Sequence, residues 1–184
     1  MGAFTWSSAD MPRINPDFPC HRLTMDERVK PVVQRRRKFN EDKHLVIWEE
    51  TWKLLDVGHV REIQYPERLA NIVLVKKANG KCRMFVNFTD LNKACPKDSY
   101  PLPSIDSLVD SASGCQLLNF LEAFSGYNQI RMHPKDESKT TFMVEFAVFC
   151  YKVMPLALRT LALPIKDWWI RFLPQCLGEM YKRM

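Results

Sequence analysis

The segment NFTDLNKACPKDSYPLPSIDSLVDSASGCQLLNFLEAFSGY, residues 87–127, carries most of the structural information in this chain. Ser104 has the side chain of a helix N-cap, and a short apolar helix is expected after it. Residues 117–124 then have the apolar character of a buried strand that contains Glu122. A carboxylate in a buried strand is costly unless it is paired or coordinates a metal ion. The segment therefore predicts a helix followed by a strand with a candidate metal ligand.

The composition is that of a globular protein with a basic excess. The chain has 184 residues, of which 46% are hydrophobic and 26% charged, enough for one domain with a core. Lys and Arg number 27 against 21 Asp and Glu, giving a net charge of +6 and a pI near 9.0. This excess permits a polyanionic partner such as nucleic acid without requiring one.

The six cysteines are scattered, without a CxxC pair or a Cys/His cluster of zinc spacing. No charged-then-apolar signal segment opens the chain, so reduced thiols without disulfide partners and a cytoplasmic or nuclear location are expected. The apolar run LALPIKDWWIRFLP, residues 161–174, is interrupted by charges and is too short to span a bilayer. We therefore expect no membrane association.

Residues 1–42 are predicted to form an extended, irregular N-terminal arm, because its prolines exclude a long helix. The arm contains a basic run, Arg35, Arg36, Arg37 and Lys38. Such a run is either a solvated charge cluster, a nucleic-acid contact or a nuclear-import signal.

Residues 43–57 have the spacing of a helix that ends at Gly58. The apolar residues recur at intervals of three or four positions and therefore share one helix face; they are Leu45, Trp48, Trp52 and Leu55. We expect this stripe to pack into the core, with a base-stacking platform as the alternative.

Two strand-like runs, 71–75 and 83–88, flank the connector KKANGK, in which Asn-Gly is a strong hairpin signal. Lys76 and Lys77 give this hairpin a basic tip. The pattern alone favours a charged loop that aids solubility over a mobile lid that grips a triphosphate. Two further strand-like runs follow between Thr140 and Met154.

Longer blocks of the sequence resemble the reverse transcriptase domain of Gypsy-type plant retrotransposon Gag-Pol polyproteins. They are DMPRINPDF (10–18), QRRRKF (34–39), REIQYPERLANIVLVKKANGKCRM (61–84), TDLNKACPKDSYPLPSID (89–106), FSGYNQIRMHPKDESKT (124–140) and CYKVMP (150–155). The resemblance implies an α+β fold, the fingers and partial palm of a right-hand polymerase. Residues 43–155 would form the fingers and partial palm.

The resemblance also implies chemistry and partners. The family performs two-metal phosphoryl transfer on an RNA template and a DNA primer, and Mg²⁺ suits that reaction. Glu122 matches the first of three metal-binding aspartates. Arg83, and Lys76 or Lys77, match positions that contact the incoming triphosphate, and Tyr127 matches the aromatic gate beneath the sugar.

Four residues depart from the family pattern. Glu122 replaces an aspartate and adds a methylene, which displaces the carboxylate by one bond length. Asn87 stands where the family usually has Asp, and Cys82 where it usually has Trp. Ala147 replaces a hairpin glycine, so backbone strain is expected if that position has a positive φ.

The tail, residues 156–184, does not continue the family pattern. Residues 156–160 can be encoded TTG GCT TTG AGA ACG, and one added T gives codons for Phe-Gly-Phe-Glu-Asn, with which the family continues. Further shifted codons restore the family pattern up to the Tyr that precedes the paired aspartates. We therefore expect a one-nucleotide deletion near the codon for Leu156 and a frameshifted, non-homologous tail.

The sequence thus predicts a truncated RNA-directed DNA polymerase that is catalytically inactive. Its other two metal-binding aspartates are absent from the 184 residues, and the first is Glu122. The alternatives are a non-enzymatic nucleic-acid-binding remnant, which would use the basic arm and hairpin, and a co-opted interaction protein.

Overall fold

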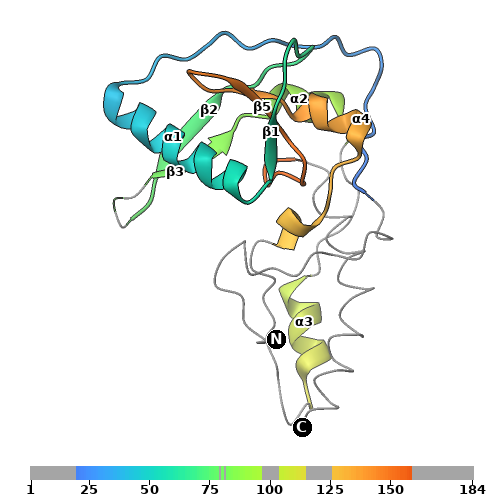
Figure 1. Cartoon of the computed structure of the whole chain (residues 1–184). Coiled ribbons are helices and arrows are strands. Elements are labelled where there is room, and N and C mark those ends of the chain that lie inside the picture. Colours follow the sequence, from blue (N-terminus) through green and yellow to red (C-terminus); the bar gives the residue numbers. More distant parts are fainter. Residues whose placement is uncertain (1–19, 79, 81, 97–103, 115–125, 159–184) are drawn as a thin grey trace.

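The computed structural model describes residues 20–78, 80, 82–96, 104–114 and 126–158 (Figure 1). Its helices are α1 (Glu41–Asp56), α2 (Thr89–Ala94), α3 (Ile105–Ala112) and α4 (Pro134–Glu137), with 3₁₀ turns η2 (Gly126–Gln129) and η3 (Ser138–Thr140). Its strands are β1 (Val60–Glu62), β2 (Ile72–Lys76), β3 (Cys82–Val86), β4 (Phe142–Met143) and β5 (Val148–Tyr151).

The strands form two antiparallel sheets. One has the order β1-β5-β4, with Val60 opposite Tyr151 and Phe142 opposite Phe149. The other is the β2-β3 hairpin. Ala70, just before β2, joins the two sheets: its N–H donates to the Thr141 carbonyl at 3.0 Å, and its carbonyl accepts from the Met143 N–H at 3.1 Å.

The core lies where these sheets meet α1 and the segment after η2. Phe142 is fully buried and packs its ring against Phe149 and Tyr151, with centroid distances of 6.0 and 5.3 Å. Further buried side chains surround it, among them Ile72, Val86, Phe88, Ile130, Met132 and Met154. Burial raises the pKa of the Tyr151 hydroxyl, which therefore stays neutral.

The predicted helix at residues 43–57 is confirmed as α1, but the prediction that its aromatic stripe packs into the core is wrong. Trp48 and Trp52 are exposed, whereas Ile47 and Thr51 are buried. Thr51 is tolerated there because its hydroxyl donates to the Ile47 carbonyl at 2.7 Å and lies 3.9 Å from the sulfur of Met84 on β3.

The hairpin predicted between residues 71 and 88 is confirmed as β2-β3. Five residue pairs form the ladder, from Ile72 opposite Val86 to Lys76 opposite Cys82. Val75 lies opposite Arg83. Gly80 has a φ of 81°, and its N–H donates to the Lys77 carbonyl at 3.0 Å. A glycine takes this left-handed conformation without the cost that a Cβ would impose.

The two strands predicted between Thr140 and Met154 are confirmed as β4 and β5. The backbone strain expected at Ala147 is absent, because Tyr65 is the only described non-glycine residue with a positive φ. The Val144 N–H instead donates to the Ala147 carbonyl at 3.0 Å, which closes a tight turn that an alanine can adopt.

The predicted cap of α3 is also confirmed, since the Ser104 hydroxyl accepts a hydrogen bond from the Ser107 N–H at 3.2 Å. The strand predicted at residues 117–124 lies outside the described residues. The described helices and strands form a mixed α and β fold, as expected. None of the described helices has both the length and the apolar character that crossing a bilayer requires.

Candidate nucleic-acid interface

The β2-β3 hairpin gathers three of the predicted contact residues at one end. Lys76 and Lys77 are exposed at the end of β2, and Arg83 is exposed on β3 opposite Val75. Since Lys76 pairs with Cys82, which precedes Arg83, the three cationic side chains lie around one turn. Such a turn can present positive charge to phosphate groups.

The basic run of the arm is exposed but its backbone is fixed. The side chains of Arg35, Arg36, Arg37 and Lys38 are all exposed. Arg36 donates to the carbonyl of Glu145 at 3.2 Å and lies 3.8 Å from the Glu145 carboxylate. Glu145 also pairs with His44 at 2.7 Å, so it connects the arm, α1 and the β4-β5 turn.

Hydrogen bonds of Gln34 and Asn71 hold this run beside β2. The Asn71 side chain donates to the Arg35 carbonyl at 2.7 Å and accepts from the Arg37 N–H at 3.2 Å. The Asn71 N–H in turn donates to the Gln34 side chain at 2.9 Å. The arm is thereby attached to the residue that begins the hairpin, and the basic run and the hairpin share one support.

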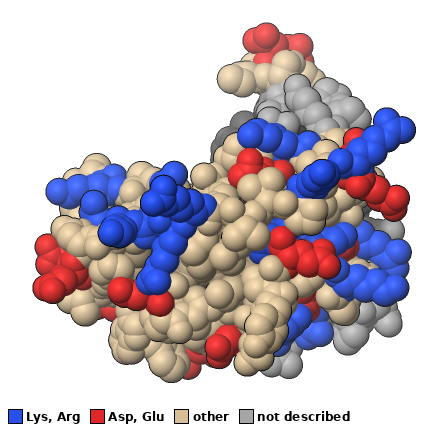
Figure 2. Space-filling model, turned by 90° about the horizontal axis from the view of Figure 1, so that it is seen from above, with Lys and Arg blue, Asp and Glu red and all other residues tan. Residues whose placement is uncertain are grey.

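Figure 2 shows how charge is distributed on one face of the molecule. Lys and Arg side chains gather in separate groups, with acidic side chains and uncharged surface between them. This pattern differs from one continuous basic stripe. Any nucleic-acid contact on this face is therefore made through separate cationic groups.

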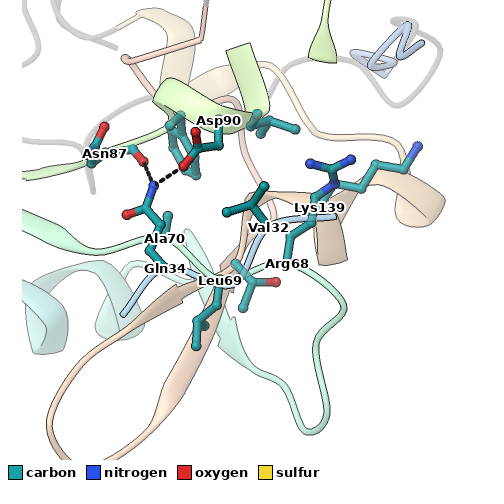
Figure 3. A pocket seen from close by; sticks show the side chains of 11 residues that line it. Val32, Gln34, Arg68, Leu69, Ala70, Asn87, Asp90 and Lys139 are labelled. Atoms are coloured by element: carbon teal, nitrogen blue, oxygen red, sulfur yellow. Dashed lines mark hydrogen bonds between the residues drawn. The ribbon is translucent and has the colours of Figure 1, made fainter. Parts of the chain in front are cut away.

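A small hollow, open to solvent, lies where the arm meets α2 and η3 (Figure 3). The Gln34 amide spans it, donating to the Asn87 carbonyl at 3.2 Å and to the Asp90 carboxylate at 2.9 Å. The hydrogen bond from Gln34, together with Lys93 at 3.3 Å, lowers the pKa of Asp90. With its carboxylate bonded on both sides, Asp90 anchors the arm and is poorly placed to act as a base.

Arg68 lines the same hollow and is buried, and its guanidinium donates to the Val29 carbonyl at 3.1 Å. Lys139, at the edge of the hollow, pairs with Asp136 at 2.7 Å. The Arg68 contact again joins the arm to the rest of the fold. The hollow is therefore best explained as the place where the N-terminal arm packs against the rest of the fold.

Asn87, which departs from the family pattern, has a structural role here. Its side-chain oxygen accepts from the Thr89 N–H at 3.2 Å and from the Thr89 hydroxyl at 2.5 Å. An asparagine supplies the same oxygen acceptor as an aspartate at the start of a helix. The change from Asp to Asn that the resemblance implies would thus preserve the local turn before α2.

Of the remaining predicted site residues, the structure describes only Tyr127. It lies half-buried in η2, at the edge of the hydrophobic core. Figure 1 shows η2, which contains Tyr127, well apart from strands β2 and β3. Glu122 lies outside the described residues.

The described residues contain no group of three or more His, Cys, Asp or Glu side chains that could hold a metal ion. Two of the described carboxylates serve other contacts: Asp136 accepts from the Leu23 N–H at 3.0 Å, and Glu137 accepts from Arg61 at 2.7 Å. A fit to Mg²⁺ therefore rests on Glu122 alone among the predicted residues.

Gln34 and Asn71 were not predicted from the sequence. A buried amide before a strand gives no periodic signal, and the two partners are 37 positions apart. The clue in the sequence is modest: Asn71 is the one polar residue in the otherwise apolar run LANIVLV, and a buried polar side chain needs partners.

Comparison with known proteins gives a consistent result. Residues 75–160 match the family model for "Reverse transcriptase (RNA-dependent DNA polymerase)". The chain is 26% identical over 133 residues to the retrovirus-related Pol polyprotein from transposon 297 of Drosophila melanogaster, covering 70% of this chain and 13% of that protein. It is 36% identical over 89 residues to the transposon Tf2-3 polyprotein of Schizosaccharomyces pombe, covering 48% of this chain and 7% of that protein.

The enzymatic polyprotein of soybean chlorotic mottle virus is 30% identical over 128 residues, 67% of this chain and 17% of that protein. The chain thus spans less than a fifth of these curated relatives. Among solved structures, the foamy viral protease-reverse transcriptase in complex with an RNA/DNA hybrid aligns with a TM-score of 0.68 at 18% identity. That alignment covers 86% of this chain and 21% of the viral one, and it shows a shared fold.

Proposed function

We propose that this chain, which carries a reverse transcriptase domain of the kind found in retrotransposon and retroviral polyproteins, derives from a Gypsy-type RNA-directed DNA polymerase and is itself catalytically inactive. The observation that carries the proposal is Glu122. By the resemblance, it stands in the segment FLEAF where the family has an aspartate, within the stretch 75–160 that matches the reverse transcriptase family model.

The physical argument concerns the length of the side chain. Mg²⁺ takes carboxylate oxygens in near-octahedral geometry at about 2.0–2.1 Å. A glutamate in place of an aspartate moves its oxygens by about one C–C bond, roughly 1.5 Å, against a tolerance of about 0.5 Å for a catalytic constellation. When a divalent ion is bound, it would activate the primer hydroxyl and stabilise the leaving group. We expect Glu122 to hold such an ion in the wrong place.

Primer extension tests this proposal. The purified chain is mixed with a primed RNA template, deoxynucleotides and either Mg²⁺ or Mn²⁺, and we expect no templated product. A product whose sequence follows the template would contradict the proposal. The matched variant Glu122→Asp removes the extra methylene, and templated extension by this variant but not by the wild type would show that the length of the Glu122 side chain blocks the reaction.

The tail supports a second part of the same proposal, that a one-nucleotide deletion near the codon for Leu156 shifted the reading frame. The family match ends at residue 160, four residues beyond that codon. Sequencing the coding DNA checks this directly: one inserted base near the Leu156 codon should open a frame through two adjacent aspartate codons. If no such frame appears, the frameshift is excluded, while the inactivity argued from Glu122 still stands.

Nucleic-acid binding without catalysis is the second candidate function, and the exposed basic turn of the β2-β3 hairpin favours it. The basic run supports it further, since its backbone is fixed by Asn71 before any ligand arrives. A preorganised cationic surface loses less conformational entropy on binding. The related foamy viral enzyme is described in complexes with an RNA/DNA hybrid and with double-stranded DNA, and we propose similar duplexes as ligands here.

A further inference from the structure

The outward face of α1 is apolar although it is exposed. Leu45, Trp48 and Trp52 are exposed to 66%, 50% and 49%. The two indole rings meet edge to face, with centroids 5.6 Å apart and an interplanar angle of 65°. Spacings of three and four residues place the three side chains on one helix face. A contiguous exposed patch of this kind marks an interaction surface more often than isolated apolar residues do.

A row of carboxylates runs beside this patch. Asp42, Glu49 and Asp56 follow one another at intervals of seven residues, so they form a line along one flank of the helix. All three are exposed, and none forms an ion pair with any residue that the structure describes. Asp56 lies in the last turn of α1, where a negative charge opposes the helix dipole. At its Asp56 end, therefore, the carboxylate row does not stabilise the helix.

We propose that this face of α1, formed by Leu45, Trp48, Trp52, Asp42, Glu49 and Asp56, docks a helix from another protein. The partner helix carries apolar residues at spacings of three and four, with lysine or arginine along one flank. Its apolar residues pack on the two indoles, and its cations face the carboxylate row, as flanking charges do in coiled coils.

The negative charge of α1 disfavours two other ligands for this face, a phosphate-bearing polymer or membrane and a second copy of α1. Helix α1 carries five carboxylates against two lysines in a chain whose net charge is +6, so it is the acidic part of a basic protein. Phosphates of nucleic acid or of anionic lipid would be repelled by the carboxylate row. A second copy of α1 packed antiparallel would bring the two acidic rows together, and like charges across an interface oppose association.

The position of α1 leaves this face accessible. Figure 1 shows α1 on the side of the described body away from α2, α3 and α4. Its inner side chains, Ile47 and Thr51, are the ones that face the sheets. A partner helix can therefore approach the outer face without displacing the core.

A labelled synthetic peptide tests the proposal on the full chain. The peptide is an amphipathic helix with leucine at the two apolar positions of each heptad and lysine at the flanking positions, and a matched peptide has glutamate in place of each lysine. Fluorescence anisotropy should show that the lysine peptide binds about tenfold or more tightly than the glutamate peptide. The double variant Trp48→Gln/Trp52→Gln should lose that binding, and Glu49→Lys/Asp56→Lys should reverse the preference.

The controls separate this surface from the rest of the chain. All substituted side chains are exposed, so every variant should still fold, with an unchanged far-ultraviolet spectrum and a cooperative thermal transition. Lys43→Gln on the opposite side of α1 should bind like the wild type. Equal binding of the two peptides, or unchanged binding by the double tryptophan variant, would overturn the proposal. So would displacement of the lysine peptide by a single-stranded oligonucleotide, or a dimer in sedimentation that disappears on substituting the two tryptophans.

Discussion

The Asn71 side chain forms hydrogen bonds with backbone groups of Arg35 and Arg37, and Asn71 directly precedes strand β2. It is buried, donates to the Arg35 carbonyl and accepts from the Arg37 N–H. Its backbone carbonyl also accepts from the Asn87 N–H at 2.8 Å, across the hairpin. One residue thus couples the arm to both strands of the β2-β3 hairpin, and its replacement should affect all three.

We expect Asn71→Ala to lower the free energy of unfolding by about 1–3 kcal/mol, because two part-buried hydrogen bonds to the arm, each contributing about 0.5–1.5 kcal/mol, would be lost. Urea unfolding measures this change, and hydrogen exchange at the Arg37 amide should become faster. Asn40→Ala is the matched control: Asn40 is exposed and makes no side-chain capping bond, so we expect a change within about 0.5 kcal/mol. Equal effects of the two variants would show that Asn71 is not the support of the arm.

At the scale of the element, the end of α1 is fixed by Gly58. Its φ is 74°, its N–H donates to the Leu55 carbonyl at 2.9 Å, and the His59 N–H donates to the Leu54 carbonyl at 2.8 Å. These two bonds form a Schellman motif, which satisfies carbonyls at the helix end. The chain then turns directly into β1, which begins at Val60.

Gly58→Ala should reduce stability by about 1 kcal/mol, since a Cβ is unfavourable at this positive φ. The cost is conformational alone, because no atom lies within 4 Å of the position that the new Cβ would take. Chemical denaturation gives the value, and the far-ultraviolet spectrum should be unchanged. A decrease well above about 2 kcal/mol would instead indicate a steric clash.

The β2-β3 hairpin is the element whose charge should govern nucleic-acid affinity. Replacing Lys76, Lys77 and Arg83 together by glutamine should weaken binding to an RNA/DNA duplex. The slope of log K against log salt should fall in magnitude by about 0.9 for each phosphate that the variant no longer neutralises. Filter binding at several salt concentrations measures both effects. The exposed Lys43→Gln variant on acidic α1 should match the wild type, and an unchanged slope in the triple variant would exclude the hairpin from the interface.

At the scale of the whole molecule, two buried histidines make stability depend on pH. Burial lowers the pKa of His21, although Asp136 opposes the shift, and burial lowers the pKa of His59. In the unfolded chain each returns to an ordinary value near 6.5. The unfolded state therefore binds more protons below that pH, and acidification favours unfolding.

We expect full stability above pH 6.5 and a progressive decline as pH falls below it toward the lowered pKa values of the folded state. Thermal midpoints measured between neutral pH and mildly acidic pH should show this decline. The double variant His21→Gln/His59→Gln should give a flatter profile across the same range. A wild-type midpoint that rises on acidification would contradict the assignment of neutral buried histidines.

The contribution of the sequence is clearest where the signal is local. The α1 helix and its end at Gly58, the Asn-Gly hairpin, and the Ser104 cap all follow from side chains and spacings within a few residues of one another. The family resemblance likewise rests on ordered blocks of sequence. These features depend on backbone conformations and short-range hydrogen bonds, which neighbouring residues determine.

The tertiary structure decided which side of α1 is buried. Periodicity shows that Leu45, Trp48 and Trp52 share a face, but the same helix offers a second face with Ile47 and Thr51, and the sheets pack on that one. The choice depends on the surface that β1 and β3 present, which is set by contacts far apart in the sequence. The attachment of the arm also depends on tertiary structure. Gln34 and Asn71 are ordinary polar residues in the sequence, and the fold brings the Asn71 nitrogen within 2.9 Å of the Gln34 side-chain oxygen. Burial and long-range pairing are properties of the assembled chain, because each requires partners that the local sequence does not contain.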